Sequence, residues 1–187
     1  YQMTTSLVAS EFVSELVADQ PSSVDMMIGI GLVKDTDAVY FQYLGEEQSP
    51  SALMLPSGKP CTRLPHVTLT GIEIAEDIGE FNSTKLNLFV TSNAGRTVML
   101  TSGLQTIWSQ CIITALMGVF GEYALDAPMT IDTWKGTSKM RPCFAAIRQG
   151  PTKMSDTATY EALRDARSDR DQKLVERIMR DSVSLLQ

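Results

Sequence analysis

An apolar stripe near the middle of the chain constrains the fold more than any other feature of this sequence. Apolar residues recur every three or four positions over residues 104–120, whereas polar residues such as Gln105 and Ser109 occupy the opposite side. This spacing predicts an amphipathic helix whose apolar face packs on a sheet. The stripe consists of Leu104, Ile107, Trp108, Cys111, Ile112, Ala115, Leu116, Val119 and Phe120.

Strand-like runs flank this helix on both sides. Residues 66–77, 85–91 and 96–101 precede it, and residues 128–134 and 141–148 follow it. The first run alternates around a central glycine, and a strand of this kind can bend and contribute to two sheets. The order of three strands, one helix and two strands predicts a mostly β protein with flanking helices, in the α+β class.

Each terminal part adds elements of its own. Residues 6–19 have the periodicity of a short amphipathic helix, and residues 26–33 and 38–44 are predicted to form a hairpin. Residues 155–186 alternate acidic and basic side chains before a final apolar stripe, which predicts one long helix or two. We therefore expect a single domain over residues 1–187, with an N-terminal helix and hairpin extension (1–65), a core (66–148) and a C-terminal helical tail (155–187).

Charge is unevenly distributed along the chain. The net charge is -6, and 15 of the 22 acidic residues precede Trp134. Between Trp134 and Met154, by contrast, there are five basic residues and no acidic one. An acidic chain repels nucleic acid at long range, but the local patch decides binding. The basic segment therefore predicts either a solvated hairpin or a site for an anionic partner.

The cysteines and the N-terminal composition favour a cytoplasmic protein. Cys61, Cys111 and Cys143 are odd in number and two of them lie in apolar patterns, so we expect reduced thiols. The first basic residue is Lys34, and no apolar run approaches membrane-spanning length. We therefore expect no signal or transit peptide and no association with a membrane.

No motif in the sequence indicates catalysis, so we expect a protein that is not an enzyme. The chain has one histidine and no cysteine pair at metal-ligand spacing, which predicts no zinc site and no cofactor. Cys61 and His66 are close in sequence, but a nucleophile and base also need an orienting group and an oxyanion pocket. Acidic residues cluster over residues 73–80, where a solvated loop is a better interpretation than a divalent cation site.

Three aromatic side chains fall on the polar side of predicted strands. Over residues 85–91 the alternation directs leucines inwards and directs Phe89 outwards together with Lys85. In the last two runs it directs Trp134 and Phe144 outwards, beside the basic segment. Another element often covers such aromatics, and the N-terminal hairpin and C-terminal helix are available to do so. Uncovered rings can instead stack on nucleic-acid bases.

The pattern resembles that of OB-fold single-stranded-DNA-binding proteins of phage and plasmid type. The matching pieces are KLNLFVTSNAGRTVMLTSGLQTIWSQCIITALMGV and DAPMTIDTWKGTSKMRPCFAAIR, and the resemblance extends over roughly residues 66–148. It implies an OB-like, five-stranded Greek-key barrel with a helix between the third and fourth strands. Strands followed by a helix also leave open an unclosed sheet.

The binding surface of the OB-fold, carried over to this chain, provides a candidate site. It comprises the loop after the first strand, the outer face of the next two strands and the loop that joins the last two. Whatever the fold, single strands are held by cations along the phosphates and by aromatic rings under the bases. The predicted nucleic-acid-binding residues are Phe81, Lys85, Phe89, Trp134, Lys135, Lys139, Arg141, Phe144 and Arg148.

Two functions are compatible with these observations. The first is binding of single-stranded nucleic acid, most simply DNA, with little sequence preference, by a homo-oligomer that serves DNA replication or recombination. The second is a structural or assembly subunit, of a phage or an accessory complex, whose terminal helices contact a protein partner. The acidic composition and the apolar C-terminal helix favour the second function, and the aromatic and basic hairpin favours the first.

Overall fold

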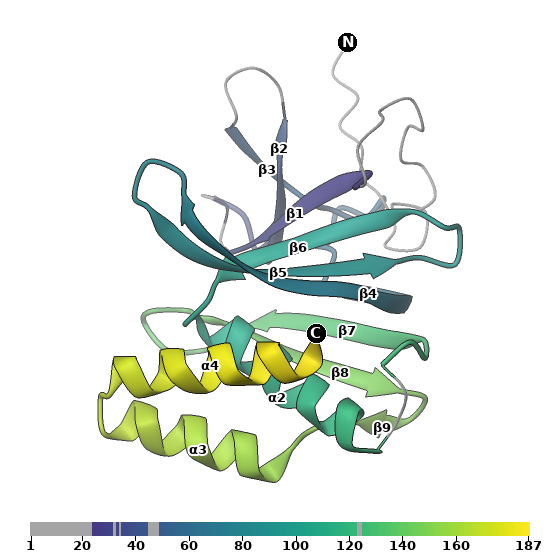
Figure 1. Ribbon diagram of the computed structural model, residues 1–187. Coiled ribbons are helices and arrows are strands. Elements are labelled where there is room, and N and C mark those ends of the chain that lie inside the picture. The colour runs from purple at the N-terminus through teal and green to yellow at the C-terminus, as the bar shows by residue number, and fades with distance from the viewer. Residues whose placement is uncertain (1–23, 32, 34, 45–48, 123–124) are drawn as a thin grey trace.

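The computed structural model describes residues 24–31, 33, 35–44, 49–122 and 125–187, which form nine strands and three helices (Figure 1). The amphipathic helix predicted near the N-terminus lies outside these described residues. The strands are β1 (Met26–Ile30), β2 (Tyr40–Leu44), β3 (Ser49–Ala52), β4 (Arg63–Ile78), β5 (Ser83–Thr91), β6 (Thr97–Gly103), β7 (Met129–Lys135), β8 (Cys143–Gln149) and β9 (Thr152–Lys153). The helices are α2 (Ile107–Glu122), α3 (Thr157–Ser168) and α4 (Gln172–Leu186).

One mixed sheet connects all the described strands. Its order is β3-β2-β1-β6-β5-β4-β7-β8-β9, and β1 and β6 form its parallel pair. The long strand β4 pairs with β7 over its first residues and with β5 over the rest. Figure 1 shows the three helices gathered at the β7–β8 end of the sheet, with β1–β3 at the opposite end. None of the described helices is both long enough and apolar enough to cross a membrane.

The predicted five-stranded Greek-key barrel is wrong, although its strands and its helix are present. Closing that barrel requires the third and fifth predicted strands, β6 and β8, to pair with each other. Instead β6 pairs with β1, which places Met26 opposite Val98 and Gly29 opposite Thr101, and β8 pairs with β9. Alternation along a strand determines which face is buried, but it does not select the partner for the free edge. The described strands therefore form an open sheet.

A buried hydrogen-bond cluster joins three distant parts of the chain. The Tyr40 hydroxyl on β2 lies 2.6 Å from the Thr133 hydroxyl on β7, and Trp108 Nε1 on α2 donates to the same Thr133 oxygen at 3.0 Å. Tyr40 is 0% exposed, and Trp108 and Thr133 are each 1% exposed. Burial raises the pKa of Tyr40 far above its usual range, so the phenol stays protonated. Thr133 thus ties α2 and β2 to β7 inside the core.

The C-terminal segment forms two helices that pack on the rest of the chain. The Asp156 carboxylate accepts a hydrogen bond from the Thr159 N–H at 2.9 Å at the start of α3, and Asp171 caps the Leu174 N–H at 3.0 Å at the start of α4. Arg170 lies between the helices with φ 54°, a left-handed conformation that redirects the chain. The apolar stripe of α4 faces the core, and its buried members are Val175, Met179, Val183 and Leu186.

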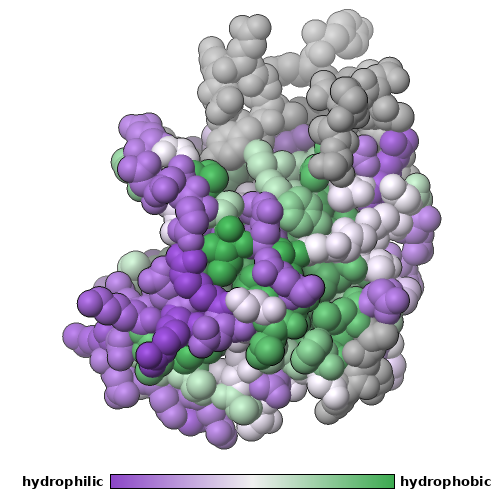
Figure 2. Space-filling view, viewed as in Figure 1, coloured by the Kyte–Doolittle hydropathy of each residue, from purple (hydrophilic) through white to green (hydrophobic). Residues whose placement is uncertain are grey.

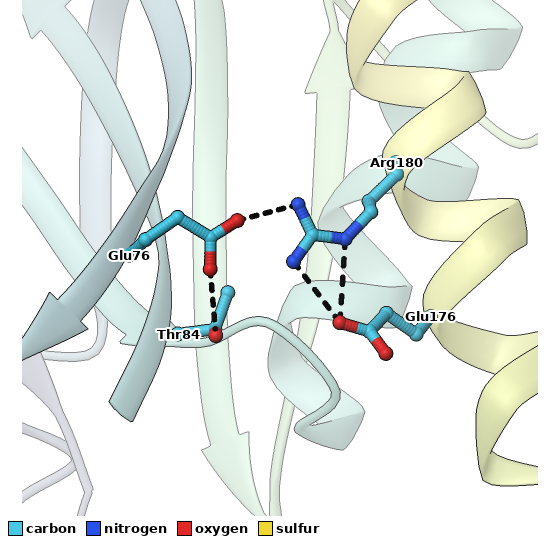
Figure 3. Close-up of polar contacts among 4 residues, drawn as sticks. All are labelled: Glu76, Thr84, Glu176 and Arg180. Carbon is cyan, nitrogen blue, oxygen red and sulfur yellow. Dashed lines mark hydrogen bonds and ion pairs between the residues drawn. The ribbon is translucent and has the colours of Figure 1, made fainter. Parts of the chain in front are cut away.

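A polar cluster at the surface holds α4 against the β4–β5 hairpin (Figure 3). Arg180 donates to the Glu76 carboxylate on β4 at 2.6 Å and to Glu176, one turn earlier on α4, at 3.0 Å. The Thr84 hydroxyl on β5 donates to Glu76 at 3.1 Å. The hydrogen bond from Arg180 lowers the pKa of Glu76. The cluster is therefore strongest when Glu76 is ionised.

The face of the molecule seen in Figure 2 combines polar and apolar regions. Hydrophilic side chains gather over the C-terminal helices at the lower left, and hydrophobic side chains are visible near the centre. The charged faces of α3 and α4 are thus turned to solvent, as their alternating acidic and basic residues require.

Thr133→Val keeps the shape of the side chain and removes its hydroxyl. The Tyr40 and Trp108 groups then lose their partner, and each buried group left unsatisfied costs roughly 1–3 kcal/mol. We expect the free energy of unfolding, measured by urea denaturation, to fall by about 2–6 kcal/mol. Thr133→Ser retains the hydroxyl, so its free energy of unfolding should fall clearly less. Equal losses in both variants would show that packing, rather than hydrogen bonding, explains the role of Thr133.

Glu76→Gln removes the charge that Arg180 binds. Because the pKa of Glu76 is lower in the folded state, its contribution to stability is present above the unfolded pKa and is lost as the pH falls through the folded pKa. We expect the variant to be less stable than the parent near neutral pH and equally stable in acid, by urea denaturation at each pH. Asp181→Asn, at an exposed carboxylate on α4, is the control. A difference that persists unchanged in acid would contradict this assignment.

Candidate functional site

The nine predicted site residues divide between two hairpins of the sheet. Phe81, Lys85 and Phe89 belong to the β4–β5 hairpin, whereas the other six belong to the β7–β8 hairpin. Phe81 is 85% exposed. Phe89 lies over Gly71 of β4, where a Cβ atom would come within 3.4 Å of its ring. Trp134 and Phe144 of the β7–β8 group border an apolar groove, so the candidate site is centred there.

Two aromatic rings form the centre of the β7–β8 hairpin. Trp134 and Phe144 are directly opposite each other in the register, with ring centroids 6.2 Å apart and planes 16° from parallel. Trp134 is 43% exposed and Phe144 is half-buried. Gly136 makes this arrangement possible, because a Cβ atom there would lie 2.5 Å from the Phe144 ring. With nearly half of its surface open to solvent, the Trp134 ring is available to a ligand.

The loop of this hairpin carries two exposed cations. Lys139 and Arg141 are both exposed, and neither forms an ion pair with any described residue. The Arg141 N–H donates to the Ser138 carbonyl at 2.9 Å, which closes a tight turn. Arg141 itself has φ 43°, in the left-handed region. The turn presents both cations to solvent beside the aromatic pair.

The two remaining predicted cations are engaged within the chain. Lys135 is 11% exposed in its side chain, lies 3.6 Å from the Asp37 carboxylate and donates to the Thr36 carbonyl at 3.2 Å. Arg148 lies 3.6 Å from Asp132. That carboxylate also accepts a hydrogen bond at 2.7 Å from the neighbouring strand β4. Lys135 and Arg148 therefore anchor the hairpin, and their charges are partly neutralised before any ligand arrives.

A cavity of about 470 Å³ opens beside the aromatic pair, between α2, β8 and α3. We call it the α2–β8 groove. Trp134 and Phe144 line one side of it, and Tyr160 and Arg167 of α3 also line it. Lys153 and Arg167 are the two cationic side chains of the described lining, which includes no acidic residue. The other lining residues are Ile107, Gln110, Cys111, Thr114, Ala115, Ala145, Ala146, Met154, Ser155 and Leu163.

A buried amide positions one of the two groove cations. Gln110 on α2 is 4% exposed, and its Oε1 accepts a hydrogen bond from Arg167 Nη1. The Gln110 Nε2 group donates in turn to the Gln105 carbonyl at 2.9 Å. The guanidinium is therefore held at the groove by one of its donors, and a guanidinium has five N–H groups in total to offer.

A thiol also lines the groove. Burial raises the pKa of the Cys111 thiol, and this effect is larger than the opposing one from the Ala145 backbone. Cys61, Cys111 and Cys143 are all free cysteines, and Cys61 is buried. At neutral pH the groove therefore presents a neutral thiol, which adds no negative charge to the cationic surroundings.

Helix α3 supplies a part of the site that was not predicted from the sequence. Tyr160 and Arg167 lie seven positions apart, which is two helical turns, so they share a face of α3 with Leu163. An aromatic residue on the same face as a cation was the available signal. The segment was predicted to form one long helix or two, and none of its residues was assigned to the site. Lys153 was counted in the basic segment but was not assigned to the site.

The described residues provide no arrangement suited to a metal ion. No group of three or more histidine, cysteine, aspartate or glutamate side chains among them is placed to hold one. Within the acidic cluster of residues 73–80, Glu76 instead binds Arg180. In comparisons with known proteins, no family model, no curated protein and no solved structure matches the chain.

Proposed function

We propose that this chain binds single-stranded nucleic acid, most simply DNA, with little sequence preference, through the β7–β8 hairpin and the α2–β8 groove. The observation that carries the proposal is the Trp134–Phe144 pair, whose Trp134 ring is 43% exposed, between the loop with its two cations and a groove whose described lining has no acidic residue. Every base has a flat aromatic face, so a ring that stacks on bases does not distinguish between sequences. The role is binding rather than catalysis.

Local charge allows this binding despite the acidic composition of the chain. Lys139 and Arg141 lie on the loop of the hairpin that carries the aromatic pair, and Lys153 of β9 and Arg167 of α3 line the groove that the pair borders. The net charge of -6 acts over the whole molecule and is screened over about 10 Å at ~0.1 M salt. Phosphates bound at the surface lie closer to these cations than this distance. We therefore expect binding that is tight at low salt and weakens steeply as salt is added.

The three free thiols support a reducing compartment, and we place this activity in the cytoplasm. Assembly of the chain into a homo-oligomer stays a prediction, which light scattering of the purified protein tests.

The alternative function, a structural or assembly subunit, receives less support from the geometry. It relied on both terminal helices as surfaces for a protein partner, and the helix predicted over residues 6–19 lies outside the described residues. In the structure Val175, Met179 and Val183 of the apolar stripe of α4 are buried against the same chain. Leu185, 59% exposed, is the large apolar side chain of α4 that remains at the surface. Nucleic-acid binding is therefore the function that we put to the test first.

Removing either ring of the aromatic pair should weaken binding of a fluorescent oligo(dT). Each stacked base contributes about 1–3 kcal/mol, so Trp134→Ala or Phe144→Ala should raise Kd by roughly 5- to 150-fold in fluorescence anisotropy. Phe120→Ala, at a 50% exposed ring on α2 outside the groove, is the matched control and should leave Kd unchanged. Phe81→Ala tests whether the β4–β5 hairpin also contributes. Equal effects of the Trp134 and Phe120 variants would refute the assignment of the pair.

Reversing three cations around the aromatic pair should remove the electrostatic part of binding. We expect the triple variant Lys139→Glu, Arg141→Glu, Lys153→Glu to lose measurable binding at moderate salt. At low salt the slope of log K against log salt should become shallower by about 2, because each phosphate that is no longer neutralised on a single strand reduces the slope by ~0.7.

A second triple variant controls for net charge. Lys59→Glu, Lys173→Glu and Arg177→Glu change the net charge of the chain equally at exposed positions outside the groove. This variant should bind nearly as well as the parent. If both triple variants weaken binding to the same extent, the affinity depends on overall charge and the proposed site is wrong.

A further inference from the structure

We propose that the α2–β8 groove takes in a single base, turned out of the bound strand, with its phosphate held between Lys153 and Arg167. This inference rests on the proposed function and deepens it, because it assigns the groove a ligand distinct from the stacking platform. Stacking at the surface needs only a flat ring, but in this protein a cavity also lies next to that ring. The space, its lining and its charges each point to a nucleotide.

Small side chains create the space. Ala115 of α2 and Ala145 and Ala146 of β8 all line the groove, and the three are 3%, 7% and 4% exposed. The cavity of about 470 Å³ falls within the usual range of small-molecule sites, roughly 300–1,000 Å³. Trp134 and Phe144 border both the cavity and the outer surface. A strand that stacks on these rings therefore runs past the opening of the groove.

The lining matches the chemistry of a base more closely than that of a purely apolar ligand. Apolar atoms of Ile107 and Leu163 suit the flat faces of a base, and the hydroxyls of Thr114 and Ser155 suit the hydrogen-bonding groups at its edge. A hydrocarbon chain would leave these polar groups without partners, at a cost in binding free energy. A base can form hydrogen bonds with these hydroxyls and fill the apolar volume at the same time.

The charges place the phosphate. Lys153 and Arg167 are the charged side chains among the described residues of the lining, and both are cationic. Gln110 already holds Arg167 in position, so little side-chain entropy is lost when a phosphate binds it. The planar guanidinium can donate two parallel hydrogen bonds to phosphate oxygens. A nucleotide, which joins an anionic phosphate to a planar aromatic base, uses both the cations and the apolar cavity.

Alkylation of Cys111 reports directly on occupation of the groove. The thiol lines the cavity, so a base inside it should shield the sulfur from N-ethylmaleimide, with the modified peptide quantified by mass spectrometry. At saturating oligo(dT) we expect alkylation to slow about tenfold when about nine-tenths of the protein is bound, since the free fraction reacts. Cys143 serves as the internal reference, because it is outside the groove lining and alternation along β8 turns it to the face opposite Phe144.

An abasic oligonucleotide of the same length separates the base from the backbone. It carries the same phosphates and should compete for the cations without slowing the alkylation of Cys111. Arg167→Gln should reduce the protection of Cys111 by oligo(dT), whereas Arg177→Gln, at an exposed position on α4, should not.

Three results overturn this inference, and they are distinguishable. If oligo(dT) binds in a Trp134-dependent way but leaves Cys111 alkylation unchanged, the groove takes no base while the proposed function stands. If the abasic strand protects Cys111 as well as oligo(dT) does, the backbone covers the groove and no base enters it. If oligo(dT) does not bind at low salt, the proposed function fails and the inference fails with it.

Discussion

The arrangement of this protein depends on one buried hydroxyl. Thr133 accepts a hydrogen bond from Trp108 and shares another with Tyr40, so α2, β2 and β7 meet at a single oxygen in the core. Apolar packing alone tolerates small shifts of a helix along a sheet, but a hydrogen bond between buried groups has a fixed length and direction. Trp134 follows Thr133 along β7 and so points to the other face. The hydroxyl of Thr133 thus fixes α2 against β7, the strand that also carries Trp134.

Competition for strand edges explains why the sheet stays open. The strands that resemble an OB-fold core are present and in the expected order, and β4 does pair on both sides with β5 and β7. The edge of β6 could pair with β8 or with β1, and the parallel pairing with β1 satisfies its backbone groups. A consequence is that β8 does not join β6, and α2 and β8 border a groove together.

Local electrostatics and packing divide the basic residues into two kinds. Lys135 and Arg148 bind Asp37 and Asp132, so they stabilise the hairpin within the chain. Lys139 and Arg141 face solvent and form no ion pair with any residue that the structure describes, and Lys153 joins Arg167 at the groove. A count of charges along the sequence treats all of these alike. The difference arises from which acids the fold brings within about 4 Å of each cation, the range of an ion pair.

The sequence by itself determined the local elements of this protein and the faces that they bury. Periodicity placed the central helix, the strands around it and the N-terminal hairpin, because hydrophobic spacing is a property of neighbouring residues. It also placed Trp134 and Phe144 on the same face of their strands, where the two rings stack. The tertiary structure alone decided that β1 takes the edge of β6, and that α3 brings Tyr160 and Arg167 to the groove. These outcomes depend on which of several similar strand edges and helix faces meet. The free-energy differences between such pairings arise from contacts between residues that are distant in sequence, and a local pattern does not contain that information.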